Sequence, residues 1–188
     1  MFTSIQQNVF RRLERFGDWF LPTLARFIFG VTLFYYFFHS AKLKLGAEGL
    51  NALFKPTAGM FGQMLPAGAE AVSYDVMQAT SLQKAIMLSG TWVEFILPVL
   101  IIIGLLTRFA AIGMVIFIAF MTFVDLYGHG GISDPSIVGA WFDTDTTGIV
   151  LDLRIYWLFL LLYLIFRGAG PLSIDRLFRA RRTRSGNF

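Results

Sequence analysis

The stretch Ala85–Tyr127, AIMLSGTWVEFILPVLIIIGLLTRFAAIGMVIFIAFMTFVDLY, decides the fold. It holds two apolar runs, from about residue 85 to 106 and from 109 to 127, separated only by Thr107 and Arg108. A helix that crosses a bilayer needs about 20 predominantly apolar residues, and each run is close to that length. Because the break is so short, the stretch predicts two neighbouring transmembrane helices joined by a tight turn.

Two further apolar runs extend this pattern, at about residues 20–41 and 149–166. The chain of 188 residues is 56% hydrophobic and only 15% charged, against roughly a quarter charged in an ordinary soluble domain. The absence of Cys excludes a disulfide scaffold and thiol catalysis. We therefore predict an all-α polytopic membrane protein, in which residues 1–188 form one domain with four transmembrane helices in a bundle.

The segments outside the spans are also apolar. Large apolar residues recur at helical spacing among the arginines of residues 1–19, which predicts an amphipathic helix lying in the headgroup layer. Residues 42–84 are too apolar for a free linker and predict short interfacial helices. Exposed apolar patches usually mark interaction surfaces. We therefore expect four side chains of the outer segments to lie against membrane or protein: Leu53, Phe54, Phe61 and Trp141.

The charge distribution predicts the orientation, because Lys and Arg collect on the cytoplasmic side of membrane helices. Arginines flank the first, second and fourth runs on one side: Arg11, Arg12, Arg15, Arg108, Arg167, Arg176, Arg179, Arg181, Arg182 and Arg184. The loop between the third and fourth runs carries Asp134, Asp143 and Asp145 and no Lys or Arg. Both termini should be cytoplasmic, with residues 167–188 as a basic tail. Because this tail adjoins a membrane span, anionic lipid explains its charge better than a nucleic acid does.

Polar residues inside the spans are the main functional indication, since charge at membrane depth usually faces the bundle interior. Glu94 lies well inside the second run, before Pro98. Polar and aromatic positions of the other helices form stripes at helical spacing: Thr32, Tyr35, His39 and Lys42; Thr122, Asp125 and His129; Asp152, Tyr156, Phe159 and Tyr163. Arg154 should point away from the last stripe. The pattern predicts a polar cavity that opens outward, with Glu94 near its floor and within reach of the first stripe.

Simpler interpretations remain open for several of these residues. Lys42, Asp152 and Arg154 lie close enough to helix ends to sit among headgroups. The tyrosines, Tyr35, Tyr36 and Tyr156, together with Trp157, fit an outer aromatic belt equally well. His39 and His129 are weak candidates for metal or haem ligands, because neither Cys nor a closely spaced His pair accompanies them.

Three stretches resemble the DoxX family of membrane proteins. Leu24–Gly30, followed by Ala41-Lys42-Leu43, is similar to the first helix of that family. Glu94–Pro98 together with Gly104–Ala111 is similar to its second helix and turn. The ending Gly168-Ala169-Gly170-Pro171-Leu172-Ser173-Ile174-Asp175 is similar to a Gly-Pro-Gly-x-x-Ser-Leu-Asp motif that follows its last helix, and it departs from that motif at Ala169 and Pro171. The resemblance covers the four spans and implies a four-helix bundle of the inner membrane.

The resemblance also implies redox work with the quinone pool. We then expect quinone as the ligand, with Glu94, His39 and Asp125 exchanging protons. Thr32, Tyr35, Lys42 and Tyr156 would line the quinone cavity. Electrons would come from a partner, because no binding motif for flavin, haem or iron–sulfur is evident. The alternatives are a non-catalytic anchor or assembly partner, as part of a hetero- or homo-oligomer, and a pathway for a small solute or metal ion.

Overall fold

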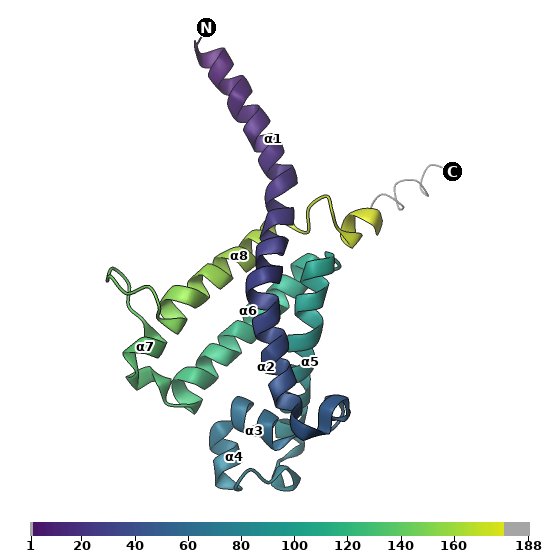
Figure 1. Cartoon of the computed structure of the whole chain (residues 1–188), viewed down its shortest axis with the longest axis vertical. Helices are drawn as coiled ribbons and strands as arrows, with labels where there is room; N and C mark the ends of the chain where they lie inside the picture. Colours follow the sequence, from purple (N-terminus) through teal and green to yellow (C-terminus); the bar gives the residue numbers. More distant parts are fainter. Residues whose placement is uncertain (1, 179–188) are drawn as a thin grey trace.

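The computed structural model describes residues 2–178, which are largely helical and contain no strand (Figure 1). The first membrane helix is a continuous rod made of α1 (Phe2–Phe29), a π-helical turn η1 (Gly30–Phe34) and α2 (Tyr35–Leu45). The other long helices are α5 (Ser81–Ile103), α6 (Thr107–Phe123) and α8 (Arg154–Arg167). Four candidate spans result, Gln6–Leu53, Ser81–Ile103, Thr107–Gly128 and Ile149–Arg167, which confirms the predicted all-α polytopic membrane fold.

The first helix is longer than a membrane requires. From Phe2 to Leu45 it measures roughly 65 Å at 1.5 Å per residue, about twice the thickness of a bilayer core. Its N-terminal half projects beyond the bundle (Figure 1). The helix expected over residues 1–19 therefore forms, as far as it is described, but no break separates it from the span that follows.

The bundle core is built from aliphatic and aromatic side chains of all four spans. On the first helix Ala25, Phe29, Leu33 and Phe37 are buried at intervals of four residues, which places them on one face. They meet buried residues of the other three helices: Ile101, Ala110, Ala111, Met114, Ile118, Leu161 and Leu164. Helix α6 packs between α5 and α8, while α2 packs on α5 and α1 on α8.

The segment between α2 and α5 forms a small outer layer with a core of its own. It contains η2 (Gly46–Leu53), α3 (Ala58–Met64), α4 (Pro66–Ala71) and η3 (Val76–Gln78). Phe61 is fully buried and Leu53 is partly buried against this core, which confirms their expected contact with protein. Phe54 stays 73% exposed although its ring meets Trp92, and Trp141 stays 61% exposed. The protein itself therefore leaves these two side chains largely uncovered.

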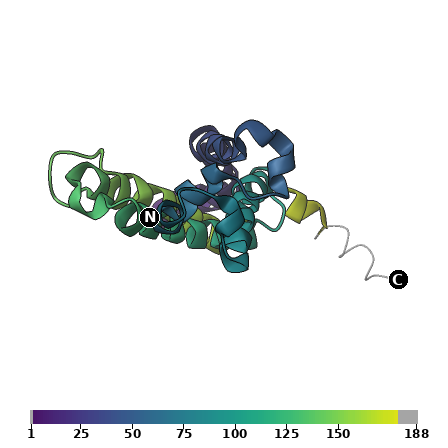
Figure 2. The ribbon, with the colours of Figure 1, turned by 90° about the horizontal axis from the view of Figure 1, so that it is seen from below.

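The second outer loop follows α6 through η4 (Val124–Gly128), η5 (Gly131–Ser133), α7 (Pro135–Val138) and η6 (Ile149–Leu153). Seen from the end that carries α3 and α4, this loop projects to one side of the molecule (Figure 2). Short local turns hold it together. The Ser136 hydroxyl and amide donate hydrogen bonds to Asp134, and these bonds lower the pKa of that carboxyl.

A buried arginine joins three segments at the opposite end of the bundle. The guanidinium of Arg26 donates to the carbonyls of Ile101 (3.0 Å) and Ile102 (2.5 Å) at the end of α5, and to those of Ala169 (2.8 Å) and Leu172 (2.6 Å) after α8. The segment beyond α8 also reaches the start of α6. Its Asp175 carboxylate accepts hydrogen bonds from the amides of Leu106 and Thr107, in the manner of a helix N-cap.

Most arginines of the described chain lie on α1, at the turn between α5 and α6, or at and beyond the end of α8, whereas Arg154 lies at the start of α8, toward the opposite end. Arg108 donates to the Phe166 carbonyl, and Arg167 pairs with Asp18. The arginines at positions 179, 181, 182 and 184 lie outside the described residues. The turn between α5 and α6 and the end of α8 therefore lie at one end of the bundle, and the side of the membrane that this end faces stays a prediction.

Cysteine labelling tests that orientation, because the chain has no Cys of its own. We expect a Ser136→Cys variant to react with an impermeant maleimide in intact cells. A Gln7→Cys variant, at the basic end, should react only after the cells are permeabilised, since Lys and Arg flanks stay cytoplasmic. The reverse pattern of labelling would overturn the predicted topology.

Candidate polar cavity

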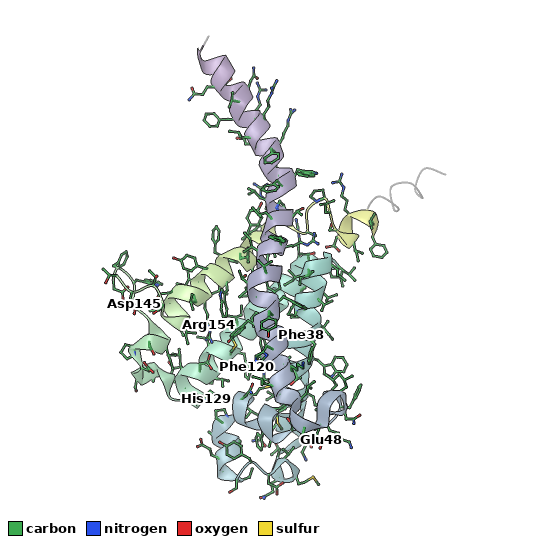
Figure 3. The ribbon with its side chains drawn as sticks, viewed as in Figure 1. Phe38, Glu48, Phe120, His129, Asp145 and Arg154 are labelled. Atoms are coloured by element: carbon green, nitrogen blue, oxygen red, sulfur yellow. The ribbon has the colours of Figure 1, made fainter. Side chains whose placement is uncertain are left out.

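A cavity of about 180 Å³ opens where α2, α5 and α6 meet the outer layer. Its lining combines ionisable, hydroxyl, amide and apolar side chains: Tyr36, Ser40, Lys44, Gln63, Met64, Glu94, Phe117, Phe120, Met121, Val124, Asp125 and His129. Figure 3 labels Phe120 and His129, which lie on α6 and just beyond it, on the side that faces α3. The cavity therefore lies at the end of the bundle that was predicted to face outward.

An ion pair between Lys44 and Glu94 forms the floor of this cavity. The Nζ–Oε1 distance is 2.5 Å, and the two side chains are only 5% and 1% exposed. The Ser40 hydroxyl lies 3.4 Å from the same carboxylate oxygen, whereas Glu94 Oε2 is buried without a hydrogen-bond partner in the described chain. Glu94 is therefore buried in the bundle and lines a polar cavity, which confirms its expected interior position.

The partner of Glu94 comes from a stripe that the sequence analysis missed. Tyr36, Ser40 and Lys44 follow one another at intervals of four residues and so share one helix face. All three line the cavity. This spacing is visible in the sequence, but the stripe of Thr32, Tyr35, His39 and Lys42 also has helical spacing, so spacing alone does not choose between the two faces.

The predicted stripe of Thr32, Tyr35, His39 and Lys42 does not line the cavity, so that prediction is wrong. All four residues are exposed on the far side of the helix, with Tyr35 71% exposed and its ring stacked on His39. The reason is that Leu33 and Phe37 take the buried face, which turns this polar stripe outward. Its exposure favours the aromatic-belt interpretation of Tyr35 and the headgroup interpretation of Lys42.

The fourth helix also presents a face opposite to the predicted one. Arg154 lies on a different face from the predicted stripe, as expected, but it is the buried side chain, whereas Tyr156 and Phe159 of the stripe are 65% and 72% exposed. Arg154, labelled in Figure 3, makes an ion pair with Asp125 and donates a hydrogen bond to the Thr122 hydroxyl at 2.7 Å. Asp125 and Thr122 therefore face inward as predicted, but their partner is the arginine rather than a tyrosine stripe. Tyr156 is not part of the cavity.

The two histidines lie in different surroundings. The His129 ring is at the mouth of the cavity, with Nε2 3.4 Å from the Gln63 carbonyl oxygen. His39 lies outside it, against Tyr35. Among residues 2–178 no group of three or more His, Cys, Asp or Glu side chains is arranged to hold a metal ion. The histidines thus do not combine into the metal or haem site considered from the sequence.

The walls of the cavity are aromatic and its inner end is closed by the apolar core. The Lys44 ammonium lies 5.8 Å from the centre of the Phe117 ring, within the range of a cation–π contact. Phe37 packs edge-on against the same ring. Beyond these rings the buried side chains of the core fill the bundle. A ligand in the cavity would therefore meet polar groups at the floor and aromatic rings at the sides.

Three of the stretches that carry the family resemblance meet at the other end of the molecule: Leu24–Gly30, Gly104–Ala111 and Gly168–Asp175. Arg26 binds carbonyls of Ile101 and Ala169, and Asp175 caps α6 at Thr107. Only Glu94 belongs both to a resembling stretch and to the cavity. Most of these motif residues therefore hold helices together and do not form the polar site.

The fold and the cavity define the class: a multi-pass, all-helical membrane protein with a buried ion pair in a cavity at one end of a four-helix bundle. Comparison of the chain with family models, curated proteins and solved structures finds no match.

Proposed function

We propose that this protein is a membrane redox subunit that binds a quinone ring in the polar cavity and exchanges protons with it. The observation that carries the proposal is the Lys44–Glu94 pair, buried at the cavity floor with one carboxylate oxygen unpartnered. The desolvation cost of burying such a pair offsets much of the Coulombic attraction between its charges. A buried ion pair is therefore weak evidence for a purely stabilising role. An unpartnered carboxylate oxygen beside an ammonium group, on a residue that lines a cavity, suits proton exchange with a bound ligand.

The lining supplies what a quinone ring needs. Lys44 and the Tyr36 and Ser40 hydroxyls are hydrogen-bond donors for its carbonyl oxygens, and Phe117 and Phe120 offer faces for its ring. Conversion of quinone to quinol takes two electrons and two protons. In this proposal the electrons come from a redox protein partner, and the protons pass through the Glu94–Lys44 pair. Asp125 and His129, at the mouth, connect that pair with the outer side. His39 has no part in it, because it lies outside the cavity.

The proposal includes the location and the family. We place the protein in the inner membrane with both termini cytoplasmic, because the described arginines that flank the spans, Arg154 apart, lie toward one end of the bundle. We also propose that it is a DoxX family member, on the strength of the resembling stretches alone. Its surroundings are lipid on the bundle sides and a partner subunit at one end.

A binding experiment on the purified full chain tests the proposed function. We expect a soluble benzoquinone without a side chain to bind the wild type and to bind Glu94→Gln at least tenfold more weakly, a loss of about 1.4 kcal/mol. Gln fills the same space and can still accept from Lys44, but it cannot titrate. Lys42→Gln is the matched control, because Lys42 is exposed outside the cavity and should bind like the wild type. Equal binding by Glu94→Gln, or no binding by the wild type, would contradict the proposal.

A second function, a non-catalytic anchor or assembly partner, is favoured by the projecting half of α1. Its apolar residues Val9, Phe10, Leu13, Phe16 and Trp19 are each at least half exposed. Such a surface needs lipid or protein against it. Co-purification of a stoichiometric protein partner without any bound quinone would support this function over the first.

A further inference from the structure

We infer that a groove between α5 and α6 holds the apolar chain of the ligand whose ring occupies the polar cavity; this rests on the proposed function. The groove has a volume of about 280 Å³ and faces the bilayer. Helix α5 contributes Ser89, Gly90 and Val93, and α6 contributes Gly113 and Ile116. Ser89 is exposed and Ile116 is 65% exposed, so a chain can enter from the surrounding lipid.

The groove and the polar cavity are neighbours that share part of their walls. Met64, Phe117 and Phe120 line both. Met64 reaches the boundary from α3 because Gly90 leaves room for it: a Cβ at position 90 would lie 1.9 Å from Met64 Cε. Met has an unbranched, flexible side chain that adapts to different packing. A change of its rotamer would join the lipid-facing groove to the polar floor.

The depth of the site decides which kind of amphiphile fits. Glu94 lies about 20 Å from the start of α5 and about 14 Å from its end, at 1.5 Å per residue. A phosphate headgroup would pay a large desolvation cost at that depth. A ligand with a compact uncharged ring and a single apolar chain avoids this cost. The occupant that we infer is therefore a lipid-soluble carrier with an uncharged ring and one isoprenoid or alkyl chain, rather than a phospholipid, whose phosphate would be desolvated.

The test compares two ligands, a benzoquinone with a single decyl chain and the same ring without a chain, on the detergent-solubilised full chain. The decyl chain should raise the affinity of the wild-type protein for the ligand about tenfold or more, since each buried CH₂ contributes favourably to binding. Ser89→Trp and Ile116→Trp fill the groove from opposite helices and should abolish this gain while leaving binding of the bare ring unchanged. Val99→Trp, at a lipid-facing position outside the groove, is the control and should keep the gain.

The outcomes separate the two proposals. If the bare ring binds and both groove variants keep the full gain from the chain, the groove inference is overturned and the proposed function stands. If Glu94→Gln weakens the binding of both ligands equally, and the groove variants weaken the binding of the decyl ligand alone, both proposals are supported. If the wild type binds neither ligand, both fail. Co-purified phospholipid that the decyl ligand cannot displace would also overturn the inference.

Discussion

Replacing Glu94 by Ala should lower the free energy of unfolding by about 3–5 kcal/mol, the largest effect of any single change in the cavity. The substitution leaves the Lys44 ammonium without its counter-ion at a place where its side chain is only 5% exposed. Thermal unfolding of the purified protein in one detergent measures the loss. The exposed pair Asp18–Arg167 is the matched control, because Asp18→Ala should cost less than about 1 kcal/mol.

A double variant separates stability from function at the same site. Lys44→Met combined with Glu94→Leu removes both charges and replaces them with apolar side chains of similar size. Such replacements of buried ion pairs are often neutral or stabilising. We therefore expect the double variant to unfold close to the wild-type temperature but to bind no quinone ring. A Glu94→Ala protein as stable as the wild type would show that the pair is not buried as described.

Replacing Arg26 by Met should give the second large effect and lower the free energy of unfolding by about 3 kcal/mol or more. The guanidinium donates to four carbonyls on two separate segments, and these acceptors would lose their partners in a buried place. Arg26→Lys should recover only part of the loss, because an ammonium group cannot reproduce the planar fork of donors. Thermal unfolding gives the stability. Limited proteolysis within residues 168–178 gives a second readout, since this segment should detach from the end of α5.

Arg108→Met is the matched control for Arg26. Arg108 lies at the same end of the bundle but is exposed and makes one hydrogen bond, to the Phe166 carbonyl. It should change stability by less than about 1 kcal/mol. Equal stability of Arg26→Met and Arg108→Met, with no new cleavage near residue 170, would contradict the joining role of Arg26.

The sequence by itself determined the four spans, the tight turn at Arg108 and the interior position of Glu94. These features follow from local properties. A long apolar run has few alternatives to crossing the bilayer, and a carboxylate deep within such a run cannot reach the headgroups. The short turn between the second and third spans leaves no choice except antiparallel neighbours.

Only the tertiary structure decided which face of each helix turns inward. A membrane helix is apolar nearly all round, so its buried face is selected by packing and not by contrast with water. On the first helix the large side chains of Phe29, Leu33 and Phe37 fill the core, which turns Lys42 outward and Lys44 inward. On the fourth helix Arg154 turns inward because Asp125 and Thr122 of α6 satisfy its guanidinium. Pairing across helices depends on distances in space, which spacing along a single helix does not contain.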